Sequence, residues 1–119
     1  MLARGLRLRS SRRIAAAFRE GRRLSGDMVS LVWRAREDGL PTQVAITAMR
    51  KVGRKPARNR ARRRLRAVVQ ALAGGLRPGY DVILIARPQA LTAAFAVLAE
   101  EVRSLMASAG VWSGGGERP

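Results

Sequence analysis

The chain contains no cysteine and no histidine. The absence of cysteine excludes disulfide bonds and thiolate chemistry, and the two absences together exclude zinc sites built from the usual ligands. Without imidazole, the chain also lacks the side chain that most often acts as a general base in catalysis. Any chemistry performed by the protein itself would therefore have to rest on carboxylates.

Carboxylates are scarce as well, with 8 Asp and Glu against 24 Lys and Arg. They are scattered along the chain, and the only sequence neighbours among them are Glu37 with Asp38 and Glu100 with Glu101. Neither pair has the spacing of a metal site or of a general acid with its base. We therefore predict no catalytic residue and no metal ligand in this chain.

Long apolar runs are missing too, since no stretch approaches the roughly 18 to 20 residues that span a bilayer. The N-terminus has no apolar signal core, so we expect a soluble, cytoplasmic protein. Its arginine-rich, acid-free start is also typical of a mitochondrial transit peptide. However, it runs directly into Ile14, Ala17 and Phe18, whose helical spacing favours a place in the folded domain.

What the chain has in excess is positive charge, with a formal net charge of +16. Residues 1–66 hold 20 basic and 4 acidic side chains, whereas residues 67–119 hold 4 of each. A compact protein with this balance must tolerate strong self-repulsion or bind a polyanion. A nucleic acid is the partner that this composition favours.

We expect one domain at residues 1–112 and a flexible tail at residues 113–119. Apolar spacing and turn residues predict helices at 10–20, from about 57 to 72 and from 92 onward, and strands at 28–35, 43–49 and 82–86. This order, α-β-β-α-β-α with room for one further short strand, predicts an α/β two-layer sandwich on a small mixed sheet. The first two strands are expected to form a hairpin, and Phe95 and Trp112 to be packing residues.

Residues 58–66 read RNRARRRLR. On a helix, Ala61, Leu65, Val68 and Leu72 form one apolar stripe with Val69 beside it, so this segment is predicted to be an amphipathic helix packed on the sheet. The charged side chains fall elsewhere: Asn59, Arg62, Arg63 and Arg66 lie opposite the stripe, Arg60 and Arg64 on a flank, and Arg58 at the entry turn.

A solvated charged surface is the ordinary interpretation of such a run. Here no Asp or Glu occurs between residues 39 and 80. Like charges at i and i+4, such as Arg58 with Arg62, cost an isolated helix about 0.2 to 0.5 kcal/mol per pair. Guanidinium groups suit phosphate, and neutralising phosphates releases counterions, so the helix is predicted to bind nucleic acid.

Three segments together resemble the protein subunit of bacterial ribonuclease P. They are TAMRKVG, ARNRARRRLR and DVILIARP. The corresponding family patterns, in the same order, are S-K-K-x-G, R-N-R-x-[KR]-R-x-x-R and D-x-[IV]-[IV]-x-A-[RK]. The resemblance covers about residues 8–106. By position it implies that the RNA subunit is bound by Arg50, Lys51, Arg58, Asn59, Arg60, Arg62, Arg63 and Arg66. Met49 replaces the family serine, so a hydroxyl contact is not expected there.

The resemblance also implies a cleft for the single-stranded 5′ leader of precursor tRNA, carried by Ile14, Phe18 and Trp33. Unpaired bases can stack on exposed rings in such a cleft. The strand pattern of Trp33 leaves open whether it faces the cleft or the opposite side of the sheet. A left-handed βαβ crossover is implied as well, although general statistics favour the right-handed form.

The implied activity is endonucleolytic removal of the 5′ leader, in which the catalytic RNA performs the phosphodiester hydrolysis with Mg²⁺. The protein alone would bind no cofactor and would not be catalytic. Its partners would be the catalytic RNA and precursor tRNA, with no membrane and no obligatory protein partner. A ribosomal or other structural RNA-binding protein is the alternative with the same size and charge, and a helix-turn-helix DNA-binding module is disfavoured by the strands.

Overall fold

A computed structural model describes residue 2 and residues 4–114 of the chain. The elements are η1 (Arg4–Leu6), α1 (Ser11–Glu20), β1 (Arg22–Ser25), β2 (Val29–Ala35), β3 (Gln43–Ala48), η2 (Arg50–Val52), α2 (Lys55–Leu72), η3 (Ala73–Gly75), β4 (Tyr80–Ala86), η4 (Pro88–Leu91) and α3 (Phe95–Ala109), where η marks a 3-10 turn. The predicted α/β class and the order of its elements are confirmed, and β1 is the additional short strand.

The sheet has the strand order β1-β2-β4-β3, with β3 parallel to β4 and the other pairs antiparallel. The predicted hairpin between the strands at 28–35 and 43–49 is wrong, because β4 lies between them and pairs with both. Val82 is opposite Trp33 on one side and Val44 on the other. An uninterrupted apolar strand such as β4 needs both faces covered, and the central position provides that. The hairpin of this sheet is β1–β2.

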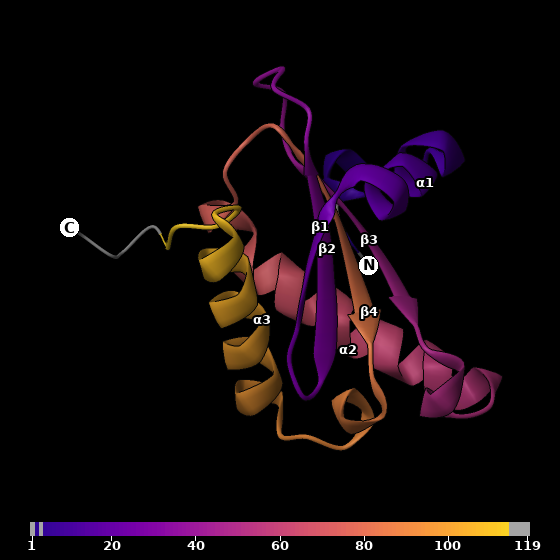
Figure 1. Ribbon diagram of the computed structural model, residues 1–119. Coiled ribbons are helices and arrows are strands. Elements are labelled where there is room, and N and C mark those ends of the chain that lie inside the picture. The colour runs from indigo at the N-terminus through magenta and orange to yellow at the C-terminus, as the bar shows by residue number, and fades with distance from the viewer. Residues whose placement is uncertain (1, 3, 115–119) are drawn as a thin grey trace.

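The helices cover the two faces of the sheet unequally (Figure 1). α2 and α3 pack on one face and form the main core, which includes Leu65, Val82 and Leu98. α1 packs on the other face over a smaller cluster around Ala17 and Ile83. Among the described residues, no helix is long and apolar enough to cross a membrane.

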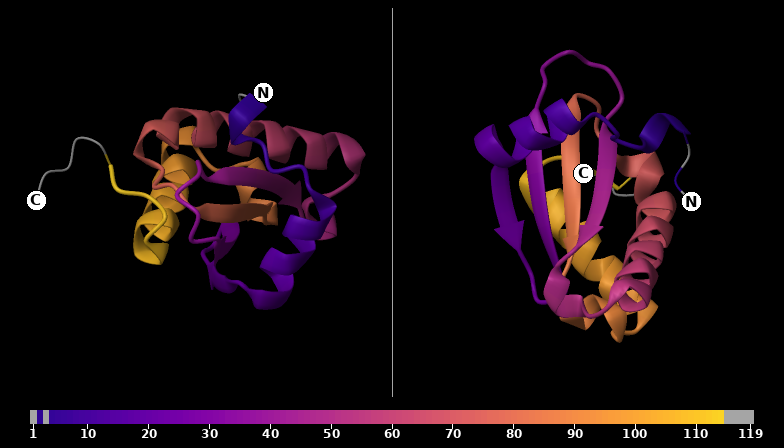
Figure 2. Two further views of the ribbon diagram at one scale, coloured as in Figure 1. Left: turned by 90° about the horizontal axis from the view of Figure 1, so that it is seen from above. Right: turned by 90° about the vertical axis from the view of Figure 1, so that its right-hand side faces the viewer.

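The connection from β3 through α2 to β4 is a left-handed crossover. In the right-hand view of Figure 2, α1 lies in front of the sheet, both strands run downward and β4 lies to the left of β3. α2 lies behind, because its buried residues share a cluster with Val44 and Val82 rather than with Ala17. The handedness implied by the family resemblance is therefore confirmed, against the right-handed form of about 98% of such connections.

The two edges of the sheet differ. Along β3, the N-terminal segment forms a parallel bridge between Arg7 and Val44, and the Leu8 amide donates to the Val44 carbonyl at 2.9 Å. The other edge is β1, a short strand whose Arg22 and Arg23 are exposed. Sequence reasoning left β1 unassigned because the segment RRLS contains only one apolar residue.

The C-terminal helix differs in detail from the prediction. α3 begins at Phe95, and its buried residues are Leu98, Val102 and Met106. Phe95 itself is 45% exposed, so its predicted packing role is wrong: it stands in the first turn, where the helix has only begun to meet the core. Trp112 does pack, and its indole N–H donates to the Leu72 carbonyl at 2.8 Å.

The predicted tail at 113–119 lies mostly outside the described residues. At its start, the Ser113 amide still donates to the Gly75 carbonyl at 2.8 Å, which ties the chain down one residue beyond the predicted domain boundary.

Candidate nucleic-acid interface

The arginine-rich segment is a helix whose apolar stripe faces the sheet, as predicted. Ala61, Leu65, Val68 and Val69 are all buried. Pro56 sits in the first turn, where its missing N–H would have no helical partner in any case. The packing of this stripe holds the helix in place despite the mutual repulsion of its charges.

Among the described residues, the side chains on the charged side of α2 form no ion pair. Arg60 and Arg63 are exposed, and the other predicted RNA-binding residues of the helix are partly exposed: Arg58, Asn59, Arg62 and Arg66. Within the described part of the chain, the ion pairs involve arginines of other segments, namely Arg13, Arg19, Arg34, Arg36 and Arg103. Arg62 donates to the Asn59 side-chain oxygen, which orients both groups without neutralising the charge.

Arg64 belongs to the same run but has a different environment. Its Nη1 donates to the Ala90 carbonyl at 2.6 Å, and its Nη2 donates to the Ala93 carbonyl. These two bonds connect α2 to η4 and to the segment that leads into α3. Arg64 therefore serves the fold, whereas Arg60, which was predicted to lie on the same flank, is exposed.

The basic surface continues onto η2, directly before α2. Arg50 and Lys51 are exposed there, while Val52 between them and the helix is buried. Gly53 adopts a φ of 139°, a conformation that favours glycine, and lets the chain turn into α2. Exposed Arg54 and Lys55 join this surface; they lie between the two family motifs, and the sequence analysis did not single them out.

Arg87 is a further basic residue that sequence reasoning missed. The parallel strands β3 and β4 end side by side, since the Met49 amide donates to the Ala86 carbonyl at 2.9 Å. Arg87 follows at this end, and its Nε is buried without a hydrogen-bond partner among the described residues. The final arginine of DVILIAR was the available signal, because it occupies the basic position of the strand pattern.

On the opposite face of the sheet, two of the three predicted cleft residues lie together. Ile14 and Phe18 are one helical turn apart on α1, so they share a side of the helix. Ile14 is partly buried against the small cluster of Ala17 and Ile83, whereas Phe18 is 50% exposed. The exposed ring is available to a ligand.

Trp33 does not join them. Side chains alternate along a strand, so Val32 faces α1 while Leu31 and Trp33 face α2 and α3. Trp33 packs, partly buried, against the main core. Because residues 28–33 are almost continuously apolar, their pattern could not show which side Trp33 would face, and its placement beside Ile14 is contradicted.

A buried carboxylate, Asp81, joins α1 to the sheet. Arg13 of α1 donates from Nε to Asp81 Oδ2 at 3.1 Å and from Nη2 to Oδ1. Arg36 donates from Nη1 to Asp81 Oδ1 at 2.9 Å, and it also binds Asp38. Burial disfavours the charged form, but the bonds and charges of the two arginines outweigh it, so the pKa of Asp81 lies below its ordinary value.

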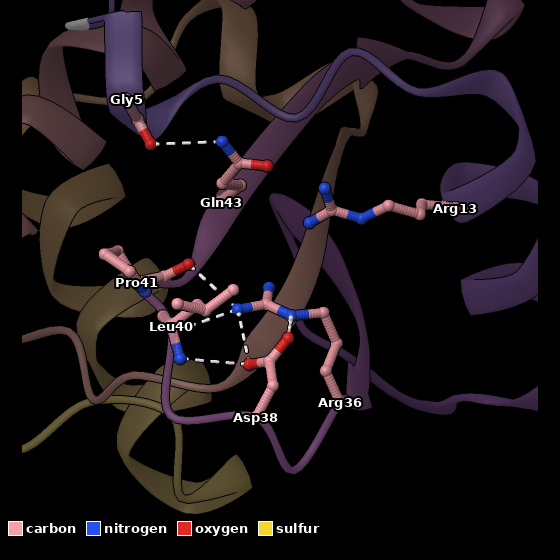
Figure 3. A pocket seen from close by; sticks show the side chains of 7 residues that line it. All are labelled: Gly5, Arg13, Arg36, Asp38, Leu40, Pro41 and Gln43. Atoms are coloured by element: carbon pink, nitrogen blue, oxygen red, sulfur yellow. Dashed lines mark hydrogen bonds and ion pairs between the residues drawn. The ribbon is translucent and has the colours of Figure 1, made fainter.

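A cavity of about 370 Å³ opens beside this cluster (Figure 3). Its lining includes Arg13 and Arg36 together with Gly5, Pro41 and Gln43. The Asp81 carboxylate is fully occupied by its two arginines and has no exposure to solvent. The cluster thus offers neither a free base nor a free nucleophile.

Among the described residues, no three side chains of the types His, Cys, Asp or Glu gather to hold a metal ion. What the surface does present is guanidinium and ammonium groups on α2 and η2, with the exposed Phe18 ring on the other face. Such a surface can bind phosphates and stack a base.

Comparison with known proteins agrees with this chemistry. Residues 2–110 match the family described as Ribonuclease P. A "Ribonuclease P protein component" from Synechococcus sp. (strain JA-3-3Ab) is 37% identical over 92% of this chain and 90% of its own length. A protein of the same name from Symbiobacterium thermophilum is 34% identical over 88% of this chain and 91% of its own.

Solved structures show the same fold. The RNase P protein of Staphylococcus aureus superposes with a TM-score of 0.78 at 16% identity, covering 91% of this chain and 98% of that one. The RNase P protein from Thermotoga maritima gives a TM-score of 0.72 at 24% identity, covering 83% of this chain and 93% of that one. From the match over nearly all of its length, the chain belongs to the ribonuclease P family, among the protein components.

Proposed function

We propose that this chain is the protein subunit of ribonuclease P, which binds the catalytic RNA and the 5′ leader of precursor tRNA during tRNA 5′-end maturation. The observation that carries the proposal is the basic side of α2, whose guanidinium groups have no acidic partner in the described chain. The family match over residues 2–110 supports the same function, and it does not favour the alternative of a ribosomal protein.

The RNA subunit would be bound through α2 and η2. Arg58, Arg60, Arg62, Arg63 and Arg66 would contact the phosphate backbone, with Asn59 held by Arg62. Arg50 and Lys51 would extend the contact beyond the helix. Guanidinium forms paired hydrogen bonds to phosphate, and release of counterions makes such binding strongly dependent on salt.

The 5′ leader would lie on the α1 side of the sheet. Phe18 offers half of its ring to solvent, and Ile14 adds an apolar surface on the same side of the helix. Unpaired bases stack on such rings with little dependence on sequence. Trp33 has no part in this site, because it packs on the opposite face.

The hydrolysis itself would belong to the RNA, with Mg²⁺ supplying charge stabilisation at the RNA active site. The donor set of this chain does not fit that ion, because its described carboxylates form no metal-binding cluster. The contribution of the protein is to position the substrate and to reduce repulsion between phosphates. It would act in the cytoplasm with no obligatory protein partner.

Reconstitution tests the proposal directly. The chain is mixed with a bacterial ribonuclease P RNA and labelled precursor tRNA at a Mg²⁺ concentration too low for the RNA alone. We expect correct 5′ cleavage only when the protein is present. Cleavage that the protein does not change, at any protein concentration that binds RNA, would contradict the proposed function.

A further inference from the structure

α1 is attached to the sheet by few apolar contacts. Its buried residues are Ala16 and Ala17, and the cluster beneath it has only four buried members among the described residues: Ala17, Val32, Ile83 and Ile85. By contrast, α2 buries a stripe of four apolar residues in the main core. Since apolar burial contributes in proportion to area, the apolar contacts alone hold α1 weakly.

The Asp81 cluster supplies a directional attachment at this place. Arg36 is fixed at the sheet end by bonds to the carbonyls of Tyr80 at 2.7 Å, Leu40 at 2.9 Å and Pro41 at 3.0 Å. Asp81 is held against it and has no exposure. Arg13 then reaches down from α1 with two hydrogen bonds to the same carboxylate, and Figure 3 shows its guanidinium lying toward that of Arg36.

The two bonds from Arg13 constrain rotation of the helix. Arg13 and Ala17 are one turn apart and face the sheet, while Ile14 and Phe18 follow each of them by one residue. A rotation of α1 about its axis would therefore move the Phe18 ring relative to the sheet. The paired donors of Arg13 resist that rotation in a way that a single point contact would not.

We propose that the Arg13–Asp81–Arg36 cluster sets the position and rotation of α1, and that Arg13 and Asp81 are thereby positioning residues for binding of the 5′ leader. The inference rests on the proposed function. It makes a specific claim about Asp81, which is fully buried and cannot touch RNA.

Direct contact between Arg13 and RNA is the competing explanation, because the Arg13 side chain is 37% exposed. The variant Asp81→Asn distinguishes the positioning role of Arg13 from direct contact with RNA. If Arg13 only positions α1, Asp81→Asn and Arg13→Ala should weaken leader binding alike. If Arg13 binds phosphate directly, Asp81→Asn should leave leader binding intact or strengthen it, since it releases the guanidinium.

The experiment uses holoenzyme reconstituted with a bacterial ribonuclease P RNA. Dissociation constants are measured for precursor tRNA carrying a long leader and for the same tRNA with the leader trimmed to a single nucleotide. We expect Arg13→Ala and Asp81→Asn to lower affinity for the long leader about tenfold, the order of one lost base stack. Affinity for the trimmed substrate and for the RNA subunit should stay at the wild-type value.

Glu101→Gln is the matched control, because Glu101 accepts the Met28 and Val29 amides and so joins α3 to the hairpin on the far face of the sheet. It removes a carboxylate held by hydrogen bonds without touching α1, so it should lower the melting temperature and keep leader preference. If Asp81→Asn does not fold, Arg13→Lys carries the test, since lysine has a point charge in place of the paired donors and should lose part of the preference.

Leader preference at the wild-type level in either Asp81→Asn or Arg13→Lys would overturn the positioning role. So would an equal loss of affinity for both substrates, or the same loss of leader preference in Glu101→Gln, because each indicates general destabilisation. A wild-type holoenzyme without any leader preference, or without cleavage, would instead contradict the proposed function itself.

Discussion

Arg60 and Arg64 lie one turn apart on α2, and their different surroundings give their charges different roles. Arg60 is exposed and forms no ion pair among the described residues, whereas Arg64 donates to the backbone carbonyls of Ala90 and Ala93. Both belong to one run of charge in the sequence. The run predicts a basic surface, but the diversion of Arg64 depends on carbonyls about thirty residues away in the chain, which no local pattern contains.

Replacing Arg62, Arg63 and Arg66 together with alanine should weaken binding to ribonuclease P RNA and leave the fold intact. These residues lie off the buried stripe, so the circular dichroism spectrum and melting temperature should remain close to wild type. The slope of log K against log salt should fall in magnitude by about 2 to 3 units. An unchanged slope would mean that this side of α2 does not contact phosphates.

Arg64→Ala is the companion variant for that measurement. It should lower the melting temperature, because the Ala90 and Ala93 carbonyls lose their donor and one or two unmet hydrogen bonds cost about 1 to 3 kcal/mol each. Its salt slope should change less than that of the triple variant.

Asp81 predicts a defined dependence of stability on pH. Its pKa is lowered in the folded protein, so it binds protons more weakly there than in the unfolded chain, where the usual value is about 3.9. Its contribution is therefore present above that value and is lost as the pH falls through the lower folded pKa. We expect the stability difference between wild type and Asp81→Asn to be constant near neutral pH and to shrink below about pH 4.

Denaturant unfolding of the two proteins at a series of pH values measures this difference. Comparing the two cancels the titration of the other carboxylates, which both proteins share. A difference that grows toward acid pH would contradict the assignment of Asp81 as a charged partner of Arg13 and Arg36.

At the scale of elements, the β1–β2 hairpin depends on a residue far away in the sequence. Glu101 of α3 accepts hydrogen bonds from the Met28 amide at 2.7 Å and the Val29 amide at 2.9 Å, and from the Asp27 amide at 3.2 Å. A carboxylate that accepts several amides stabilises a turn that has little apolar burial of its own. Gly26 lies so close to Glu101 that a Cβ there would meet its carboxylate at 2.4 Å.

Glu101→Gln should therefore destabilise the protein by about 1.5 to 3 kcal/mol, the range for hydrogen bonds to a charged group. Chemical denaturation measures the loss. Hydrogen exchange of the Met28 and Val29 amides should rise more than that of amides in β4, because the hairpin end is released first. Equal acceleration throughout the sheet would show that Glu101 acts on the whole fold instead.

Elements with a regular apolar period could be predicted from the sequence, and their pairing could not. Leu65 and Val68 revealed α2 because helical spacing repeats locally. β1 stayed hidden because the segment has only one apolar residue and is stabilised by pairing with β2. The position of β4 between β2 and β3 depends on contacts between segments that are far apart in the sequence. The family resemblance supplied the crossover hand, which periodicity does not encode.

Some features of the candidate site could likewise be predicted from the sequence, and others could not. Exposure of Arg63 followed from the helical wheel, and the conjunction of Ile14 with Phe18 followed from their spacing. Trp33 was placed wrongly because its strand is apolar on both sides. The partnership of Arg13 with Asp81 joins residues 68 positions apart, so it required the structure.

For the whole molecule, the net charge of +16 makes stability depend on the anions in solution. Self-repulsion disfavours the compact state, and a polyanion that binds the folded surface relieves it. Adding ribonuclease P RNA should raise the melting temperature by about 4 °C for each kcal/mol by which its binding stabilises the folded state. Chloride of matched ionic strength should produce a smaller rise, and an equal rise would indicate screening alone.

The outer edge of the sheet, formed by β1, affects association between copies of the protein when no RNA is bound. The backbone groups of β1 remain free for pairing, but Arg22 and Arg23 stand beside them. Two copies meeting along this strand would bring four guanidinium groups together, so intermolecular β-pairing is opposed by repulsion. The exposed arginines of β1 therefore oppose association between copies of the chain and favour contact with a surface of opposite charge.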